Sequence, residues 1–66
     1  MSPEDRAEVE SALRGVRETD SITMLDRLGV AAAAQELDHE RAAALIAAMD
    51  AAAYASTLRQ AFSAPA

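Results

Sequence analysis

The last third of the chain, residues 42–62, is a nearly uncharged, alanine-rich stretch that constrains the fold more than any other part of the sequence. It reads AAALIAAMDAAAYASTLRQAF, and its only charged residues are Asp50 and Arg59. Alanine is the best helix former, because its side chain loses no conformational entropy in a helix. Glycine and proline, which interrupt helices, do not occur in this stretch. We therefore expect a long C-terminal helix.

This helix is expected to be apolar on two sides. At about 100° per residue, two groups of apolar side chains fall on nearly opposite faces. A helix that is apolar on both sides is usually buried on both sides. The first face (Leu45, Ile46 and Met49) is predicted to pack within the chain, against Val9, Leu13 and Leu25. The second face is predicted to form an interface with a partner and consists of Ala47, Ala51, Tyr54, Leu58 and Phe62.

Upstream residues predict two more helices. Ser2 is a suitable N-cap before Pro3, and the following acids favour a helix start, so we expect a first helix over residues 3–18. A short second helix is expected over residues 20–28, with Gly29 ending it in the left-handed conformation. The apolar stripe of the first helix consists of Val9, Ala12, Leu13 and Val16.

The whole chain, residues 1–66, is expected to form a single small helical domain. Residues 31–62 form its alanine-rich helical region, which either runs as one helix or bends at Asp38, a plausible N-cap. No alternating apolar pattern predicts a strand. The predicted fold class is all-α: a bundle or hairpin of about three helices with a long C-terminal helix.

The small size of the chain predicts association with another protein. A domain of this length buries only about 60% of its surface and usually needs a staple or a partner. The chain has no cysteine, so disulfides and thiolate metal sites are excluded. We therefore expect oligomerisation, as a homodimer or with a larger partner protein.

The charge of the chain argues against two classes of partner. The net charge is −5, and ten of the eleven acidic residues lie at or before Glu40. Such a balance repels nucleic-acid phosphates and anionic membrane surfaces. The charges at Asp50 and Arg59 interrupt the only long apolar stretch, so no membrane span is expected. With a polar start in place of a signal peptide, these features predict a cytoplasmic protein.

Two short motifs suggest alternative functions. Glu36 and His39 form an E-x-x-H pattern that resembles half of a carboxylate-bridged di-iron site, to which Glu8 or Glu10 could add ligands. The segment Asp20-Ser21-Ile22 resembles the site at which carrier proteins take their phosphopantetheine arm. Both segments are equally explained as helix starts. A small metal-binding or carrier protein is therefore the alternative, and no cofactor or metal is predicted.

The leading prediction is a non-enzymatic, acidic protein-interaction module, such as an adaptor, an assembly factor or an antitoxin-like bacterial regulator. Nucleophilic catalysis needs a base beside a hydroxyl. The chain has a single histidine, placed at an expected helix end, and no convergent acid–base set. No catalytic residue is therefore predicted.

Overall fold

The computed structural model describes residues 2–19 and 23–63. Within them the chain forms four α-helices and no strand, which confirms the all-α class. The helices are α1 (Pro3–Thr19), α2 (Arg27–Glu36), α3 (Glu40–Ala48) and α4 (Ala51–Phe62). The expected count of three is too low, because the alanine-rich region 31–62 is divided among three helices.

Helix α1 begins as the sequence predicts. The backbone N–H of Asp5 donates to the Ser2 hydroxyl at 3.1 Å, and acids in the first turn face the positive end of the helix dipole. The helix continues through Gly15 and ends at Thr19. Its predicted stripe is the face buried in the core, formed by Val9, Ala12, Leu13 and Val16.

The short second helix predicted over residues 20–28 is wrong for residues 23–26, which form a turn; residues 20–22 lie outside the described residues. Asp26 is the N-cap of α2, and its carboxylate accepts the backbone N–H of Gly29 at 3.2 Å. Gly29 therefore lies in the first turn of a helix instead of ending one. A Cβ at Gly29 would overlap the Asp26 carboxylate, so the missing side chain leaves room for the cap.

The alanine-rich region 31–62 is interrupted twice, first at the bend that the sequence left open at Asp38 and then, unexpectedly, at Met49. Asp38 adopts a φ of 67°, and the turn it makes leaves His39, not Asp38, as the N-cap of α3. Met49 is extended, and Asp50 then caps α4 by accepting the Ala53 N–H at 2.7 Å. If residues 39–62 formed a single straight helix, the rest of so short a chain could cover only one of its two apolar faces. Two shorter helices, α3 and α4, can each contact α1, so burial outweighs helix propensity here.

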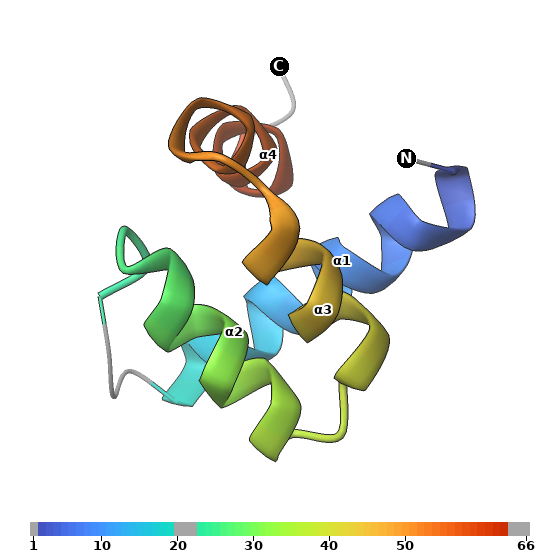
Figure 1. The fold of residues 1–66 in the computed structure, drawn as a ribbon, viewed down its shortest axis with the longest axis vertical. Coiled ribbons are helices and arrows are strands. Elements are labelled where there is room, and N and C mark those ends of the chain that lie inside the picture. Colours follow the sequence, from blue (N-terminus) through green and yellow to red (C-terminus); the bar gives the residue numbers. More distant parts are fainter. Residues whose placement is uncertain (1, 20–22, 64–66) are drawn as a thin grey trace.

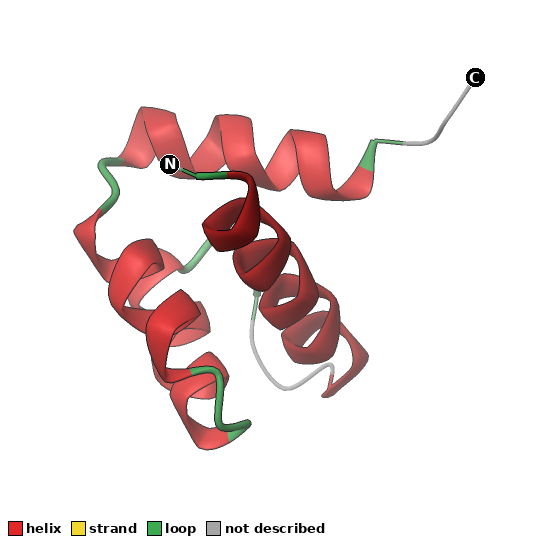
Figure 2. Ribbon diagram, turned by 90° about the vertical axis from the view of Figure 1, so that its right-hand side faces the viewer, coloured by secondary structure: helices red, strands yellow, loops and turns green. Residues whose placement is uncertain are grey.

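Helices α2 and α3 form a hairpin that lies against α1, and α4 crosses the end of this three-helix unit (Figure 1, Figure 2). The contact between α2 and α3 is the most extensive one between helices. The guanidinium of Arg27 closes this hairpin by donating to the carbonyl oxygen of Ala47 at 2.7 Å, at the C-terminal end of α3. The core consists of Val9, Ala12, Leu13, Val16, Val30, Ala31, Ala34, Ala42, Ala43, Ile46, Tyr54 and Ala61.

The predicted packing of the first apolar face is largely confirmed. Ile46 is completely buried in this core, and Leu45 and Met49 pack partly buried against it. Leu25 is the exception, because its side chain is 80% exposed. It lies in the turn before the Asp26 cap and not in the second helix that the sequence predicted.

Replacing Gly15 by alanine should stabilise the fold. A glycine inside a helix costs about 1 kcal/mol relative to alanine. A Cβ at this position would lie 3.4 Å from Leu37 Cδ1 and 3.9 Å from His39 Nε2, which are ordinary contacts. Gly15→Ala should therefore raise the free energy of unfolding by about 0.5–1 kcal/mol, measured by urea denaturation. The control Ala7→Gly, at an exposed position of α1, should lower it. A destabilised Gly15→Ala variant would contradict this packing of the 37–39 turn on α1.

Candidate protein-interaction surface

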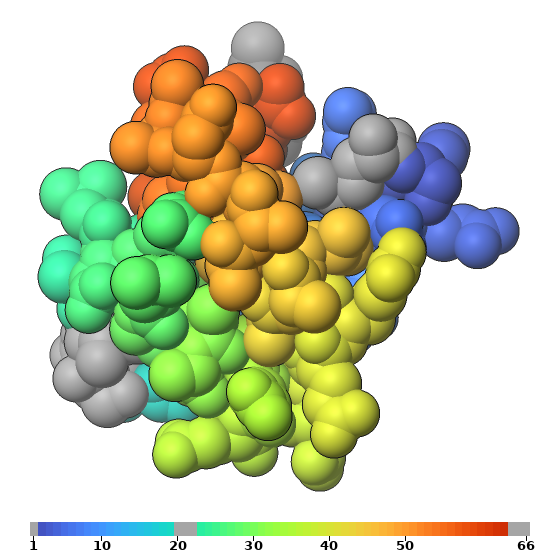
Figure 3. Space-filling view, in the orientation of Figure 1, coloured from blue at the N-terminus to red at the C-terminus, as the bar shows by residue number. Residues whose placement is uncertain are grey.

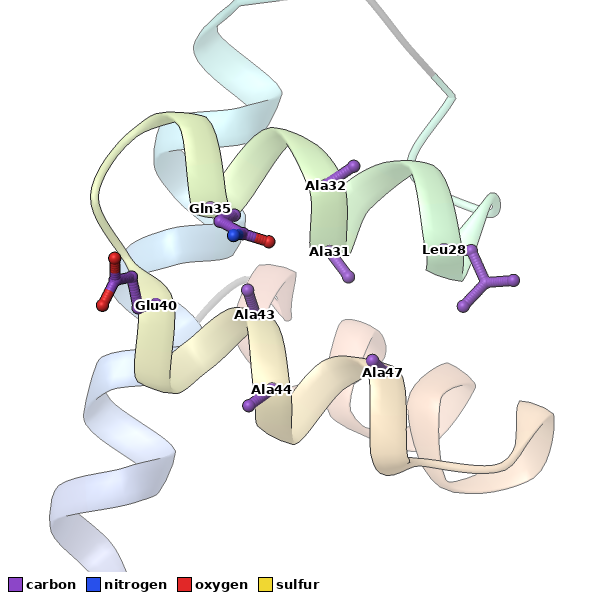
Figure 4. A pocket seen from close by; sticks show the side chains of 8 residues that line it. All are labelled: Leu28, Ala31, Ala32, Gln35, Glu40, Ala43, Ala44 and Ala47. Atoms are coloured by element: carbon purple, nitrogen blue, oxygen red, sulfur yellow. The ribbon is translucent and has the colours of Figure 1, made fainter.

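An apolar groove of about 590 Å³ runs between α2 and α3. On the face seen in Figure 3 these two helices lie side by side. Gln35 and Glu40 lie at one end of the groove, and Leu28 and Ala47 lie at the other (Figure 4). The lining residues are Leu28, Ala31, Ala32, Gln35, Glu40, Ala43, Ala44 and Ala47.

The groove exists because alanines occupy both facing helices. Ala31 and Ala43 point toward each other between the helices and form a nearly buried floor, at 7% and 6% exposure (Figure 4). Ala32, Ala44 and Ala47 are exposed along its sides. A methyl group fills little of the space between two helices, so the surface remains hollow where larger side chains would close it.

A large apolar side chain stands at one end of the groove. Leu28 lines it and is 61% exposed, and Leu25, three residues earlier in the turn before α2, is 80% exposed. Single exposed leucines are ordinary on protein surfaces. Leu28 extends the alanine-lined groove with a large exposed side chain, and a continuous apolar area of this kind is typical of interaction sites.

The charged residue that lines the groove is Glu40, at the end where the turn joins the two helices. Glu36, Asp38 and Glu40 lie close in sequence around the turn that joins the two helices, and all three are exposed. Of the arginines of the hairpin, Arg27 donates to the carbonyl oxygen of Ala47, at the opposite end of the groove, and Arg41 donates to Asp5, with Nη2 and Oδ2 3.2 Å apart. The hydrogen bond from this guanidinium lowers the pKa of the Asp5 carboxyl. The groove is therefore apolar along its length and acidic at its turn end.

The five residues predicted to form a partner interface do not share one surface. Tyr54 is only 4% exposed, and its hydroxyl donates to the backbone carbonyl of Met24, so this side chain serves the chain's own core. Leu58 and Phe62 are half-buried against the core. Ala51 is exposed on α4, whereas Ala47 lines the groove. The single-helix geometry behind the prediction is wrong, and a role of these residues in binding stays a prediction.

The two residues of the E-x-x-H pattern are used differently. His39 contacts α1 through its Nδ1, which lies 3.0 Å from Glu8 Oε1. Glu36 is exposed at the end of α2. Among the described residues, no group of three His, Cys, Asp or Glu side chains is arranged to hold a metal ion. The carrier-like segment Asp20-Ser21-Ile22 lies outside the described residues.

Tyr54 should make folding stability fall at alkaline pH. Burial, and after it the charge of Asp26, raises the pKa of the phenol. As pH rises, the unfolded chain loses this proton first, so the stability present below a pH of about 10 is lost as pH rises through the folded pKa. No lysine or cysteine competes in this range. Melting temperatures between about pH 8 and 11 should fall for the wild type.

The variant Tyr54→Phe isolates this effect. It should be less stable at neutral pH by about 0.5–1.5 kcal/mol, because the Met24 carbonyl loses its hydrogen bond. Its melting temperature should then change less with alkaline pH than that of the wild type. An equally steep decline in Tyr54→Phe would assign the effect to another group.

No protein-family model matches the chain, and neither a curated protein nor a solved structure shows detectable similarity to it. Across residues 2–19 and 23–63, none of the helices has the length and apolar character needed to span a membrane.

Proposed function

We propose that this protein is a non-enzymatic interaction module that binds protein, a second copy of itself or a larger partner, through the groove between α2 and α3. The observation that carries the proposal is the alanine-lined groove with the exposed Leu28 at its end. Apolar area removed from water contributes about 25 cal/mol per Å², against which the loss of free motion on association is set. On this surface a hollow shape and an exposed large apolar side chain occur together.

The charges and the histidine support this class of function. A net charge of −5 disfavours binding to nucleic-acid phosphates. The side-chain hydrogen bond found for His39 in the described part of the chain joins it to Glu8, and not to a hydroxyl that it could activate as a nucleophile.

Site-specific photo-crosslinking in the native host tests the proposal. A benzophenone-bearing amino acid at the exposed Gln35, at the end of the groove, should give a defined covalent adduct with a protein. The same amino acid at the exposed Ala7 of α1 should not give this adduct. Adding Ala44→Arg, which fills the groove, should abolish the adduct from Gln35. Equal adducts from both positions, or an adduct that survives Ala44→Arg, would contradict the proposal.

A further inference from the structure

We infer that the occupant of the groove is an amphipathic helix of a partner protein, with a stripe of large apolar side chains and with Lys or Arg at the end that meets the acidic turn. This inference rests on the proposed function and names the partner's chemistry. Four properties of the groove support it: its backbone, its lining, its length and its charge.

The backbone around the groove favours a helical occupant. Both walls are helices, whose N–H and C=O groups bond within the helix, and no strand edge occurs among the described residues. An extended peptide would find no backbone ladder here and would leave its own polar groups unpaired as it lost water. A helix satisfies its own backbone hydrogen bonds and presents only side chains.

The lining favours large side chains on the occupant. Helices pack at interaxial distances of about 8–10 Å, the shorter distances being possible where side chains at the contact are small. The methyl groups of Ala31, Ala32, Ala43 and Ala44 permit such a close approach, but they fill little volume themselves. Leu, Ile, Met or Phe side chains on the occupant supply that volume.

The length of the groove sets the spacing of these side chains. The lining extends over residues 28–35 of α2 and 40–47 of α3. At 1.5 Å per residue, either segment is about 11 Å long, or two helical turns. An occupant lying along the groove would therefore contact it through apolar residues at i, i+3 or i+4, and i+7.

The lining and the charges together favour a basic partner over a second copy. Glu36, Asp38 and Glu40 form the acidic end, whereas Arg27 is bonded to Ala47 at the opposite end and Arg41 is paired with Asp5 of α1. Two grooves placed face to face would bring alanines against alanines in either orientation, which leaves the hollow unfilled, and would bring carboxylates against carboxylates where the turn ends meet. A partner helix with Lys or Arg at its end meets the same rim with opposite charge.

The test uses the purified protein and three labelled, lactam-stapled helical peptides. The first carries leucines at i, i+3, i+7 and lysines at its end, the second has glutamates in place of the lysines, and the third has the leucines scattered around the helix. Stapling keeps such short helices folded, so that the comparison reports binding. Fluorescence anisotropy should show binding of the first peptide, and at least about tenfold weaker binding of the other two.

Two variants that add the same positive charge distinguish binding in the groove from general electrostatic attraction between the peptide and the acidic protein. Ala44→Arg, in the groove, should weaken the first peptide by at least about tenfold, whereas Ala7→Arg, exposed on α1, should change it by less than about threefold. Glu36→Gln combined with Glu40→Gln should weaken the lysine peptide selectively. Equal losses for the two arginine variants would overturn the inference.

The outcomes also separate this inference from the proposed function. An adduct from Gln35 together with failure of all three peptides would leave the groove as an interaction site and reject the basic helix. A different outcome is a dimer in sedimentation equilibrium that Ala44→Arg dissociates. This result would identify a second copy as the occupant and would also reject the basic helix. Loss of both the adduct and peptide binding would reject the proposed function itself.

Discussion

Leu13→Ala should unfold much of the protein at room temperature, whereas the same substitution at Leu28 should leave the fold intact. Leu13 is completely buried, and Leu28 is 61% exposed. Truncating a buried leucine costs about 2–5 kcal/mol. At about 0.05–0.15 kcal/mol per residue, a domain of 66 residues has a total stability of roughly 3–10 kcal/mol. The loss at Leu13 is therefore comparable with the whole.

Thermal and urea denaturation followed by circular dichroism measure both variants. Leu28→Ala should change the free energy of unfolding by less than about 0.5 kcal/mol, as surface substitutions usually do. It should nevertheless weaken partner binding, because Leu28 lines the groove. If Leu13→Ala and Leu28→Ala had similar melting temperatures, the described packing of α1 against α2 and α3 would be wrong.

Replacement by glutamate should have very different effects on stability at two alanines of α3 that are only two positions apart. Ala42 is fully buried, whereas Ala44 is exposed along the groove. Ala42→Glu places a carboxylate in the core without a partner, which costs several kcal/mol or forces the helix away from α1. Ala44→Glu leaves the carboxylate in water, at the small cost of replacing alanine in a helix.

Circular dichroism and one-dimensional proton NMR check this pair. Ala42→Glu should lose the dispersed methyl resonances of a packed core, and Ala44→Glu should keep them. The opposite result would show that α3 is rotated about its axis relative to the described arrangement, and the groove would then lie on a different face.

Local signals in the sequence predicted much of the fold. Ser2 before Pro3 and the stripe from Val9 to Val16 identified α1 and its buried face, since both depend only on neighbouring residues. The break before α4 was missed, although Asp50 followed by three alanines is a capping signal. Alanine propensity on both sides of Asp50 favours a continuous helix, and only packing onto α1 decides against it.

The turn before α2 was missed for a related reason. Gly29 is typical of a helix end. Here, however, the carboxylate of Asp26, three residues earlier, accepts the backbone N–H of Gly29 and so caps a helix start. Both interpretations are locally sound, and their relative energies depend on where Val30 and Ala34 find a core. Tertiary packing therefore decides between a helix end and a helix start at Gly29, and a short segment of sequence does not reveal that packing.

The candidate site depended on tertiary structure even more. A stripe such as Tyr54, Leu58 and Phe62 is visible in sequence because its members share one helix. The groove combines residues from two helices, and most of these residues are alanines. A single alanine in a sequence suggests helix packing and gives no sign of a binding site. The available signal was the pair of alanine runs, Ala31–Ala34 and Ala42–Ala44, on either side of the charged segment 36–41.

NMR of the protein labelled with ¹³C at its alanine methyl groups tests most directly whether the α2–α3 groove binds a helix. During titration with the leucine–lysine stapled peptide, we expect saturable shifts in the groove methyls and little change in those of Ala7 and Ala52, which are exposed on α1 and α4. The groove methyls are those of Ala31, Ala32, Ala43, Ala44 and Ala47. Shifts centred on α4, or spread evenly over all helices, would contradict the account.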